Sequence, residues 1–242
     1  MGAVSSSVFL LGDPVTRSLS PGMQNAAFAA LGIDSHYMPR EVDRAGLAGV
    51  IDELDPQAAR IGAVNTISRQ GSTLKGWNTD VEGFQRALAE QSGKSPSPLA
   101  GEGRGGGYRA AAIIGAGGAA RAVAAALQPA AEVWVIARNL EQARRLCRDL
   151  EIERGGPVEM NQMREMVTRV DLVVNATPAD LPPASWLRPD QRLFDLRSRR
   201  SGEGRAMLLY QGAAAFEIWT GRPAPIEAMR AALERAAEGV HA

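Results

Sequence analysis

The glycine-rich segment GAGGAAR, residues 115–121, has the residue types and spacing of a turn that binds phosphate groups. Gly115 permits a tight turn, Gly117 lets the backbone approach a pyrophosphate, and Ala120 is small enough for close packing of a helix on a strand. The helix predicted to follow would offer its unpaired N–H groups to the anion. A turn that serves packing alone is the other reading. In this context the pattern favours nucleotide binding by Gly115, Ala116, Gly117, Gly118 and Ala119.

The residue at the end of the next predicted strand indicates which nucleotide this turn would hold. An NAD site usually has an Asp or Glu about 20 residues after the first glycine, where it accepts the ribose 2′-hydroxyl. Here Arg138 stands 23 residues after Gly115. An arginine pairs with a 2′-phosphate, which a carboxylate would repel. The sequence therefore favours NADP over NAD, the alternative being that Arg138 is a solvated charge at the end of a loop.

The composition is that of a soluble globular chain and argues against several classes of protein. Of 242 residues, 45% are hydrophobic and 22% charged, and 27 basic residues balance 27 acidic ones. This balance argues against a broad surface for nucleic acid or anionic lipid. One cysteine, Cys147, and two histidines make an internal disulfide and a zinc cluster unexpected. Without a bilayer-spanning apolar run or a secretory signal, we expect a cytoplasmic protein.

Residues 91–107, QSGKSPSPLAGEGRGGG, interrupt the pattern of the chain. Eleven of the seventeen are Gly, Ser or Pro, so the segment has little means of joining a core. As a flexible coil it would span roughly 20–25 Å. We predict a linker here, between a domain at 1–90, completed by helices at 213–242, and a second domain at 108–212.

Apolar periodicity and turn residues predict strands and helices in both parts of the chain. Before the linker we expect strands at 8–11, 35–38, 63–68 and 73–77, and helices at 21–31, about 44–60 and 80–90. After it we expect strands at 111–114, 132–137, 171–174 and 192–195, and helices at 119–127, 140–150, 213–220 and 225–238. Apolar strands alternating with helices indicate an α/β fold with a parallel sheet covered on both faces.

Several separate segments resemble motifs of one family, the shikimate dehydrogenases. They are GDPVTRSLSP at 12–21, GAVNT at 62–66, NTD and GF within 78–84, GAGGAAR at 115–121, the arginine at 138, NATP at 175–178, and QGAAAFEIWTG at 211–221 with Pro225 and Met229-Arg230. These segments follow the family's order over most of the chain. Chance agreement across so many motifs is negligible.

The resemblance implies a two-lobed enzyme, with a Rossmann-like NADP domain and a smaller α/β substrate domain that has a shortened sheet. It implies NADP-dependent reduction of 3-dehydroshikimate to shikimate, a step in aromatic amino acid biosynthesis, by a monomer or homodimer without nucleic-acid or membrane partners. The sequence does not distinguish shikimate from quinate, which carries one more hydroxyl.

The resemblance also implies roles for individual residues. Ser18 and Ser20 would bind the substrate carboxylate, and Thr177 would bind the cofactor. Asn65, Asp80 and Gln211 would bind the ring hydroxyls, with Asp80 also catalytic. Such a set of hydroxyl, amide and carboxylate groups suits a polyhydroxylated substrate. Capping of the helices that follow is the alternative for Ser20 and Asp80.

The chain departs from the family pattern at four places. The family's N-V-T-x-P-x-K motif, whose lysine moves the proton, is absent, and neither Lys75 nor Lys94 matches it. The nine residues 43–51 are too few for the missing helix and strand, since a parallel crossover needs a dozen or more. A basic stretch at 196–205 replaces a family loop. Arg17 replaces the usual histidine, and Gln142 replaces a second arginine for the 2′-phosphate.

The missing lysine leaves three hypotheses for function. Loss of a positioned general acid typically slows a reaction by about 10²–10⁴-fold, and Asp80 is a poor proton donor at neutral pH unless its pKa is raised. The first hypothesis is therefore an NADP-dependent shikimate dehydrogenase that binds NADP(H) with weak or absent turnover. The second is a non-catalytic NADP(H)- or metabolite-binding homologue, and the third is a damaged gene product.

Overall fold

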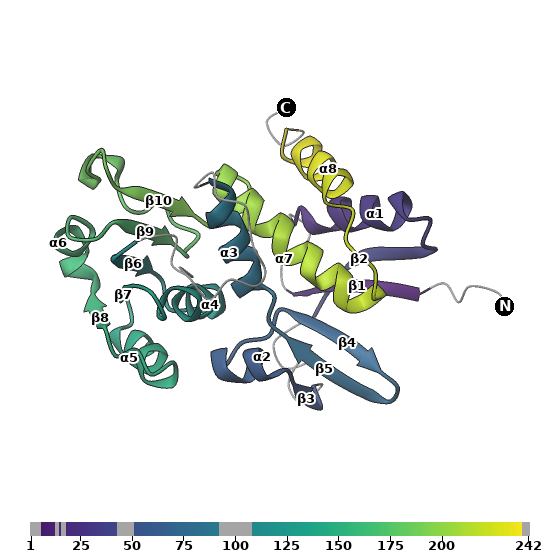
Figure 1. Ribbon diagram of the computed structural model, residues 1–242, viewed down its shortest axis with the longest axis horizontal. Helices are drawn as coiled ribbons and strands as arrows, with labels where there is room; N and C mark the ends of the chain where they lie inside the picture. Colours follow the sequence, from purple (N-terminus) through teal and green to yellow (C-terminus); the bar gives the residue numbers. More distant parts are fainter. Residues whose placement is uncertain (1–5, 13–14, 16–17, 43–50, 92–107, 239–242) are drawn as a thin grey trace.

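The structure, a computed structural model, describes residues 6–12, 15, 18–42, 51–91 and 108–238. Its largest sheet has five parallel strands in the order β10-β9-β6-β7-β8 (Figure 1). They are β6 (Ala110–Ile114), β7 (Glu132–Ala137), β8 (Gly155–Glu159), β9 (Leu172–Asn175) and β10 (Arg192–Asp195). Because β7 and β9 flank β6 on opposite sides, the strand order reverses at β6. Sheets of this kind bind ligands at the carboxyl ends of the strands beside such a reversal.

Helices cover both faces of this sheet. They are α4 (Gly118–Leu127), α5 (Leu140–Asp149) and α6 (Met163–Val167). Ile113 of β6 faces a core that includes Val123 of α4 and Leu146 of α5. Its neighbour Ile114 faces a second core that includes Val167 of α6. The prediction of a parallel sheet covered on both faces is confirmed.

The first part of the chain forms two smaller sheets with their own helices. Strands β1 (Ser6–Gly12) and β2 (Ser35–Glu41) pair in parallel, and β5 (Thr73–Trp77) lies between β3 (Glu53–Leu54) and β4 (Thr66–Gln70). The helices are α1 (Ser20–Ala30), α2 (Pro56–Ile61) and α3 (Asp80–Gln91). A smaller α/β region therefore accompanies the five-stranded sheet, in agreement with the expected fold class.

The last two helices pack against this first part. Helix α7 (Gly202–Thr220) lies beside α3 near the middle of the molecule, and α8 (Ile226–Glu238) lies beside α1 (Figure 1). A Cβ atom on Gly83 of α3 would lie 2.7 Å from the Cβ of Gln211, so the two helices meet as closely as glycine permits. Gln24 of α1 donates a hydrogen bond of 2.9 Å to the carbonyl oxygen of Gly212. Helix α7 therefore brings Gln211 to the first part of the chain.

The structure differs from the helix predicted over about 44–60. Residues 43–50 lie outside the described part of the chain, and β3 and then α2 follow. Helix α2 begins at Pro56, whose fixed φ suits a first helical position. The Asp55 side chain accepts a hydrogen bond from the backbone N–H of Gln57 at 2.9 Å. Asp55 and Pro56 therefore determine where α2 begins. The spacing of apolar residues, on which the predicted helix rested, does not mark this position.

From the sequence, no strand or helix is predicted between residues 150 and 171, where the structure has β8 and α6. The strand begins with Gly155 and Gly156, both with positive φ, and continues with Pro157. These are turn residues by composition. β8 lies at the edge of the sheet, where a proline costs no hydrogen bond on the open side.

Helix α7 also begins earlier than the predicted Ala213. It starts at Gly202, after Ser201, whose side chain accepts a hydrogen bond from the backbone N–H of Gly204 at 2.8 Å. The two glycines suggest a loop, but a serine cap starts the helix in spite of them. The domain boundary expected between 212 and 213 therefore falls inside one continuous helix.

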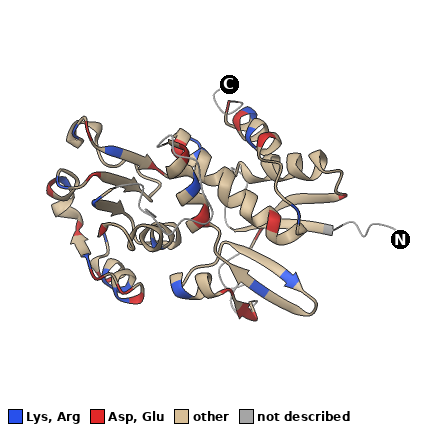
Figure 2. Cartoon of the chain, in the orientation of Figure 1, with Lys and Arg blue, Asp and Glu red and all other residues tan. Residues whose placement is uncertain are grey.

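The predicted linker at 91–107 lies almost entirely outside the described residues. Gln91 is the last residue of α3, and the structure resumes at Tyr108. Within the described part of the chain, the helices are too short or too polar to cross a membrane. Lys and Arg positions are interspersed with Asp and Glu positions in both parts of the cartoon (Figure 2), in keeping with the zero net charge.

Candidate active site

A pocket of about 480 Å³ lies beside the glycine-rich turn that joins β6 to α4. Its lining consists of Gly115, Ala116, Gly117, Ala137, Arg138, Asn139, Gln142, Met160, Ala176, Thr177 and Pro178. The volume is in the range of pockets that hold small molecules and cofactors. The pocket lies at the carboxyl ends of β6, β7 and β9, where the strand order reverses. This is where the sequence places a nucleotide.

The backbone of the turn requires glycine at its first position. Gly115 has a φ of +120°, and a Cβ atom on it would lie 3.0 Å from the carbonyl oxygen of Ala176. Gly117 is extended and precedes α4, and no side chain of a capping residue accepts the first N–H groups of the helix. Gly118 and Ala119 form the first turn of α4 and are accessible to solvent. An anion in the pocket can therefore accept these N–H groups.

Arg138 supplies the positive charge at one end of the pocket. It is exposed at the end of β7, and no other described residue forms an ion pair or hydrogen bond with its guanidinium. The pocket lining contains no carboxylate. Asn139 caps α5 by accepting the backbone N–H groups of Glu141 at 3.1 Å and of Gln142 at 3.3 Å, and both Asn139 and Gln142 line the pocket. The free guanidinium and the glycine turn together fit a nucleotide with a 2′-phosphate.

Thr177 forms part of the opposite wall. Buried Asn175, at the end of β9, accepts hydrogen bonds from the Thr177 backbone N–H at 3.1 Å and from its hydroxyl at 2.8 Å. Thr177 Oγ1 accepts a hydrogen bond from the Ala179 N–H at 3.2 Å. These hydrogen bonds fix the conformation of residues 177–179 relative to the end of β9.

Three of the predicted substrate residues form one polar network. Asn65 Nδ2 donates to Asp80 Oδ1 at 2.8 Å. Asn65 Oδ1 accepts from the backbone N–H of Thr79 at 2.9 Å and from its hydroxyl, and Thr79 Oγ1 lies 3.4 Å from Gln211 Oε1. Thr79 is thus the residue that joins Asn65 and Asp80 on one side to Gln211 of α7 on the other.

Asp80 has an unusual environment for a carboxylate. Burial raises the pKa of its carboxyl, and the hydrogen bond from Asn65 lowers that pKa by less. No lysine or arginine of the described residues contributes to the shift. The capping alternative does not apply, because the backbone N–H of Asp80 is accepted by Asn78 Oδ1 at 3.1 Å and the Asp80 side chain pairs with Asn65. Asp80 can therefore hold a proton at higher pH than an exposed aspartate.

Ser18 and Ser20 lie at the start of α1. The backbone N–H of Ser20 donates to Ser18 Oγ at 3.2 Å, and Ser20 is buried. The residue that precedes α1 is Leu19, whose side chain makes no capping hydrogen bond. Ser20 is already the first residue of the helix, so the capping role considered for Ser20 is not observed. No hydrogen bond among the described residues joins the two serines to the network of Asn65. Arg17, the departure noted in the same motif, lies outside the described residues.

Neither lysine of the chain contacts Asp80 in the described part of the structure. Lys75 lies in β5, with its Nζ 4.7 Å from the centre of the Trp77 ring. Lys94 lies outside the described residues. Among the described residues, no lysine therefore lies beside Asn65 and Asp80, where the lysine of the family motif is expected.

The network and the nucleotide pocket are neighbours. Asn78 Nδ2 donates to the carbonyl oxygen of Ala63 at 3.1 Å, and a Cβ atom on Gly118 would lie 3.5 Å from the Ala63 Cβ. Arg121 of α4 donates to the carbonyl oxygen of Ile61 through Nε, and its Nη2 lies 2.8 Å from Asp149 Oδ2. The start of α4 therefore contacts the segment that carries Asn65.

Sequence reasoning assigned no role to Thr79 of the polar network, nor to five residues that line the nucleotide pocket: Ala137, Asn139, Met160, Ala176 and Pro178. Thr79, the centre of the polar network, stands between Asn78 and Asp80, and the N-T-D motif contained the signal. Met160 lines the nucleotide pocket after β8, and it was missed because β8 itself was missed. In the described part of the chain, no group of three or more His, Cys, Asp and Glu residues could hold a metal ion.

Comparisons with known proteins identify the family. Residues 10–51 match the shikimate dehydrogenase substrate binding domain, residues 106–185 match shikimate/quinate 5-dehydrogenase, and residues 204–234 match the shikimate 5′-dehydrogenase C-terminal domain. The chain is 36% identical to a protein of Desulforamulus reducens named shikimate dehydrogenase (NADP(+)), over 93% of this chain and 94% of that one. It is 40% identical to the protein of the same name from Moorella thermoacetica, over 95% and 92%.

A solved structure gives the same result. The Thermus thermophilus shikimate 5-dehydrogenase, crystallised in complex with NADP(H) and shikimate, is 31% identical to this chain with a TM-score of 0.75. The match covers 95% of this chain and 99% of that one. The glycine turn with Arg138, the network around Asp80 and these matches agree: the chain belongs to the shikimate dehydrogenase family.

Proposed function

We propose that this chain is an NADP-dependent shikimate dehydrogenase that interconverts 3-dehydroshikimate and shikimate. Relatives with 36% and 40% identity over nearly the whole chain carry that name. The Thermus thermophilus relative was crystallised with NADP(H) and shikimate. The pocket beside Gly115 has a free arginine where a 2′-phosphate needs a cation.

The observation that carries the proposal is the contact between the two candidate sites. Ala63, to which Asn78 is hydrogen-bonded, lies against the start of α4 at Gly118. A substrate held by Asn65 and Asp80 would then lie next to a nucleotide held by that helix start. Direct transfer between two bound molecules requires such proximity.

The residues divide into three tasks. Gly115, Ala116, Gly117, Gly118, Ala119 and Thr177 hold the nucleotide, and Arg138 selects its 2′-phosphate. Ser18 and Ser20 bind the substrate carboxylate, while Asn65, Asp80 and Gln211 bind its ring hydroxyls. The nicotinamide, when bound, accepts or returns the hydride.

Asp80 is the group that exchanges the proton of the reacting hydroxyl. The expectation of weak turnover rested on the missing lysine and on an aspartate with an ordinary pKa. Burial raises the pKa of Asp80, so its acid form is available at higher pH. The comparisons lend no support to a non-catalytic homologue, because the relatives are named as dehydrogenases.

The proposal extends to organisation and setting. The substrate domain comprises 1–90 and the C-terminal part of the chain from 213, the NADP domain comprises 108–212, and 91–107 links them. Helix α7 continues across the boundary at 212 and 213 and so joins the two domains. We propose a cytoplasmic enzyme, active as a monomer or a homodimer, with no nucleic-acid partner.

Steady-state oxidation of shikimate by the purified chain with NADP⁺, beside a fluorescence titration with NADPH, tests this function. We expect saturable turnover that Asp80→Asn lowers by about 10²-fold or more, with NADPH binding unchanged in that variant. Binding of NADPH without turnover would contradict the enzymatic role and favour the non-catalytic homologue. Absence of both would contradict the cofactor assignment as well.

A further inference from the structure

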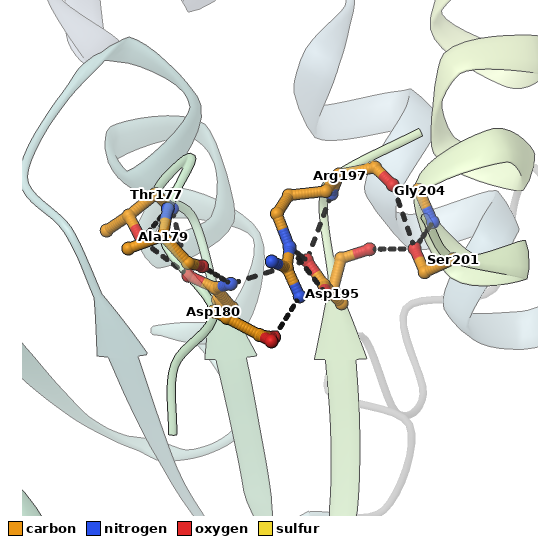
Figure 3. Close-up of polar contacts among 8 residues, drawn as sticks. Thr177, Ala179, Asp180, Asp195, Arg197, Ser201 and Gly204 are labelled. Atoms are coloured by element: carbon orange, nitrogen blue, oxygen red, sulfur yellow. Dashed lines mark hydrogen bonds and ion pairs between the residues drawn. The ribbon is translucent and has the colours of Figure 1, made fainter. Parts of the chain in front are cut away.

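Arg197 bridges two carboxylates behind the wall of the nucleotide pocket. Figure 3 shows its guanidinium between Asp180 and Asp195. Nε lies 2.9 Å from Asp195 Oδ1 and 2.8 Å from Asp195 Oδ2, and Nη2 lies 2.7 Å from Asp180 Oδ1. Arg197 does not line the pocket itself, and none of the roles proposed above uses it.

The two halves of the bridge differ in exposure. The side chains of Arg197 and Asp195 are 15% and 11% exposed, whereas that of Asp180 is 83% exposed. The pair of Arg197 with Asp195 therefore belongs to the packed protein. Asp180 belongs to a surface loop, which the guanidinium attaches to that packed pair.

The backbone that carries Arg197 is itself firmly held. Ser201 Oγ donates to the carbonyl oxygen of Asp195, and it accepts the Gly204 N–H at 2.8 Å (Figure 3). A Cβ atom on Gly204 would lie 2.7 Å from the carbonyl carbon of Arg197, so the turn from β10 packs directly on α7. Arg197 is consequently a fixed point for the loop that it holds.

The loop that contains Asp180 continues from the pocket wall. Ala176, Thr177 and Pro178 line the pocket, and Asp180 follows two residues later. Asn175 is the register partner of Asp195 and donates to the Ala179 carbonyl oxygen at 2.8 Å. The wall is thus tied at its start by Asn175 and at its end by the bridge from Arg197 to Asp180.

The position of this wall determines the width of the pocket. Ala176 and Thr177 face the glycine turn so closely that a Cβ atom on Gly115 would lie within 3.2 Å of Thr177 Cγ2. A shift of the loop away from β10 would change the gap in which the nucleotide must fit. If the wall is not already held in place, the nucleotide must order it on binding, and the cost of that ordering reduces the affinity.

We propose that Arg197 is a positioning residue for the nucleotide, acting through Asp180 to hold the Ala176–Pro178 wall against the glycine turn. The stretch 196–205, which replaces a loop of the family pattern, would supply this bridge. The inference depends on the proposed function only for the identity of the nucleotide.

Three single variants of the full chain test this inference by NADPH titration. Asp180→Asn removes the surface end of the bridge, and Arg197→Gln removes both contacts. Arg188→Gln is the matched control, because Arg188 pairs with Asp190 at 3.1 Å before β10 and does not line the pocket. Each arginine variant removes one positive charge, so the comparison isolates the bridge from net charge.

We expect Asp180→Asn and Arg197→Gln each to raise the Kd for NADPH by about threefold to tenfold, the range of one lost charge-assisted bond. The double variant should bind as Arg197→Gln does, because the two residues act through one contact. The melting temperature of Asp180→Asn should fall by at most about 2–4 °C, because one exposed contact is lost from the folded state. The Kd of Arg188→Gln should stay at the wild-type value. If Arg197→Gln does not fold, Asp180→Asn decides. Unchanged Kd values in the bridge variants, or an equal loss in Arg188→Gln, would overturn the proposal.

Hydrogen exchange of the ligand-free protein separates this inference from the proposed function. The Thr177 and Ala179 amides should exchange about threefold faster or more in Asp180→Asn than in the wild type, since local opening sets such rates. A wild type that does not bind NADPH would refute the cofactor assignment, while the exchange result would still decide the role of Arg197. Equal exchange rates would overturn that role.

Discussion

Asn65 Nδ2 donates a hydrogen bond of 2.8 Å to Asp80 Oδ1, and among the described residues Asn65 is the side chain whose hydrogen bond lowers the pKa of Asp80. An amide favours the charged carboxylate less than a lysine or arginine would. Burial therefore prevails, and the pKa of Asp80 is raised above its usual value. An aspartate in this state can act as an acid in one direction of the reaction and as a base in the other.

The pH dependence of the reaction should follow the ionisation of Asp80. Oxidation of shikimate requires the carboxylate to accept a proton, so kcat/KM in this direction should rise with pH through the raised pKa. Reduction requires the acid form, so its rate should fall over the same interval. Initial rates in both directions across a pH series measure this. Profiles that move in parallel would exclude Asp80 as the proton carrier.

Asp80→Asn should make the protein more stable at neutral pH. In the wild type the folded pKa of Asp80 exceeds the unfolded value of about 3.9, so stability declines as pH rises between these two values. Above the folded pKa the loss is constant, at about 1.4 kcal/mol for each unit of pKa shift. Thermal melting of both proteins should give equal stability near pH 3 and a more stable variant at pH 7. A difference that does not change with pH would contradict this reasoning.

Thr79→Val should weaken substrate binding more than it affects the cofactor. The valine keeps the size of threonine but loses the hydroxyl that contacts Asn65 and Gln211. We expect a KM for shikimate raised by about threefold to tenfold, the effect of one or two lost hydrogen bonds. The KM for NADP should not change. Thr73→Val, in β5 and away from the network, is the control and should leave both constants at their wild-type values.

Gly115→Ala should abolish tight NADPH binding. The residue has a φ of +120°, where an alanine costs about 1–3 kcal/mol. Its Cβ would also press on the Ala176 carbonyl oxygen at 3.0 Å. We expect the Kd for NADPH to rise by more than about tenfold. Gly22→Ala is the matched control: its Cβ would meet open space in α1, so we expect unchanged binding and a small gain in melting temperature.

Local signals predicted most of the five-stranded sheet. β7 and β10 have the predicted bounds. β7 is a mostly apolar run, and β10 has the apolar pair Leu193-Phe194 between Arg192 and Asp195. β8 was not predictable in this way, since its Gly-Gly-Pro start is typical of a loop and only an edge position makes it a strand. The start of α7 was missed for a similar reason: its stabilising contacts come from the packed turn after β10.

The nucleotide pocket was more predictable than the substrate network. The glycine turn and Arg138 are close in sequence and belong to one structural unit, so their spacing carries the information. Asn65 and Gln211 lie far apart in sequence, and only the packing of α7 on α3 brings them together through Thr79. Their roles came from the family resemblance, which periodicity could not replace.

Selectivity between coenzymes tests the central claim most directly, because the account assigns the 2′-phosphate to Arg138. Parallel titrations of NADPH and NADH should be made with the wild type, with Arg138→Gln and with Arg145→Gln, a control that removes an exposed charge from α5 outside the pocket lining. We expect the wild type and the control to prefer NADPH by about tenfold or more, and Arg138→Gln to lose that preference. Equal affinity of the wild type for both coenzymes, or a preference that survives in Arg138→Gln, would contradict the account.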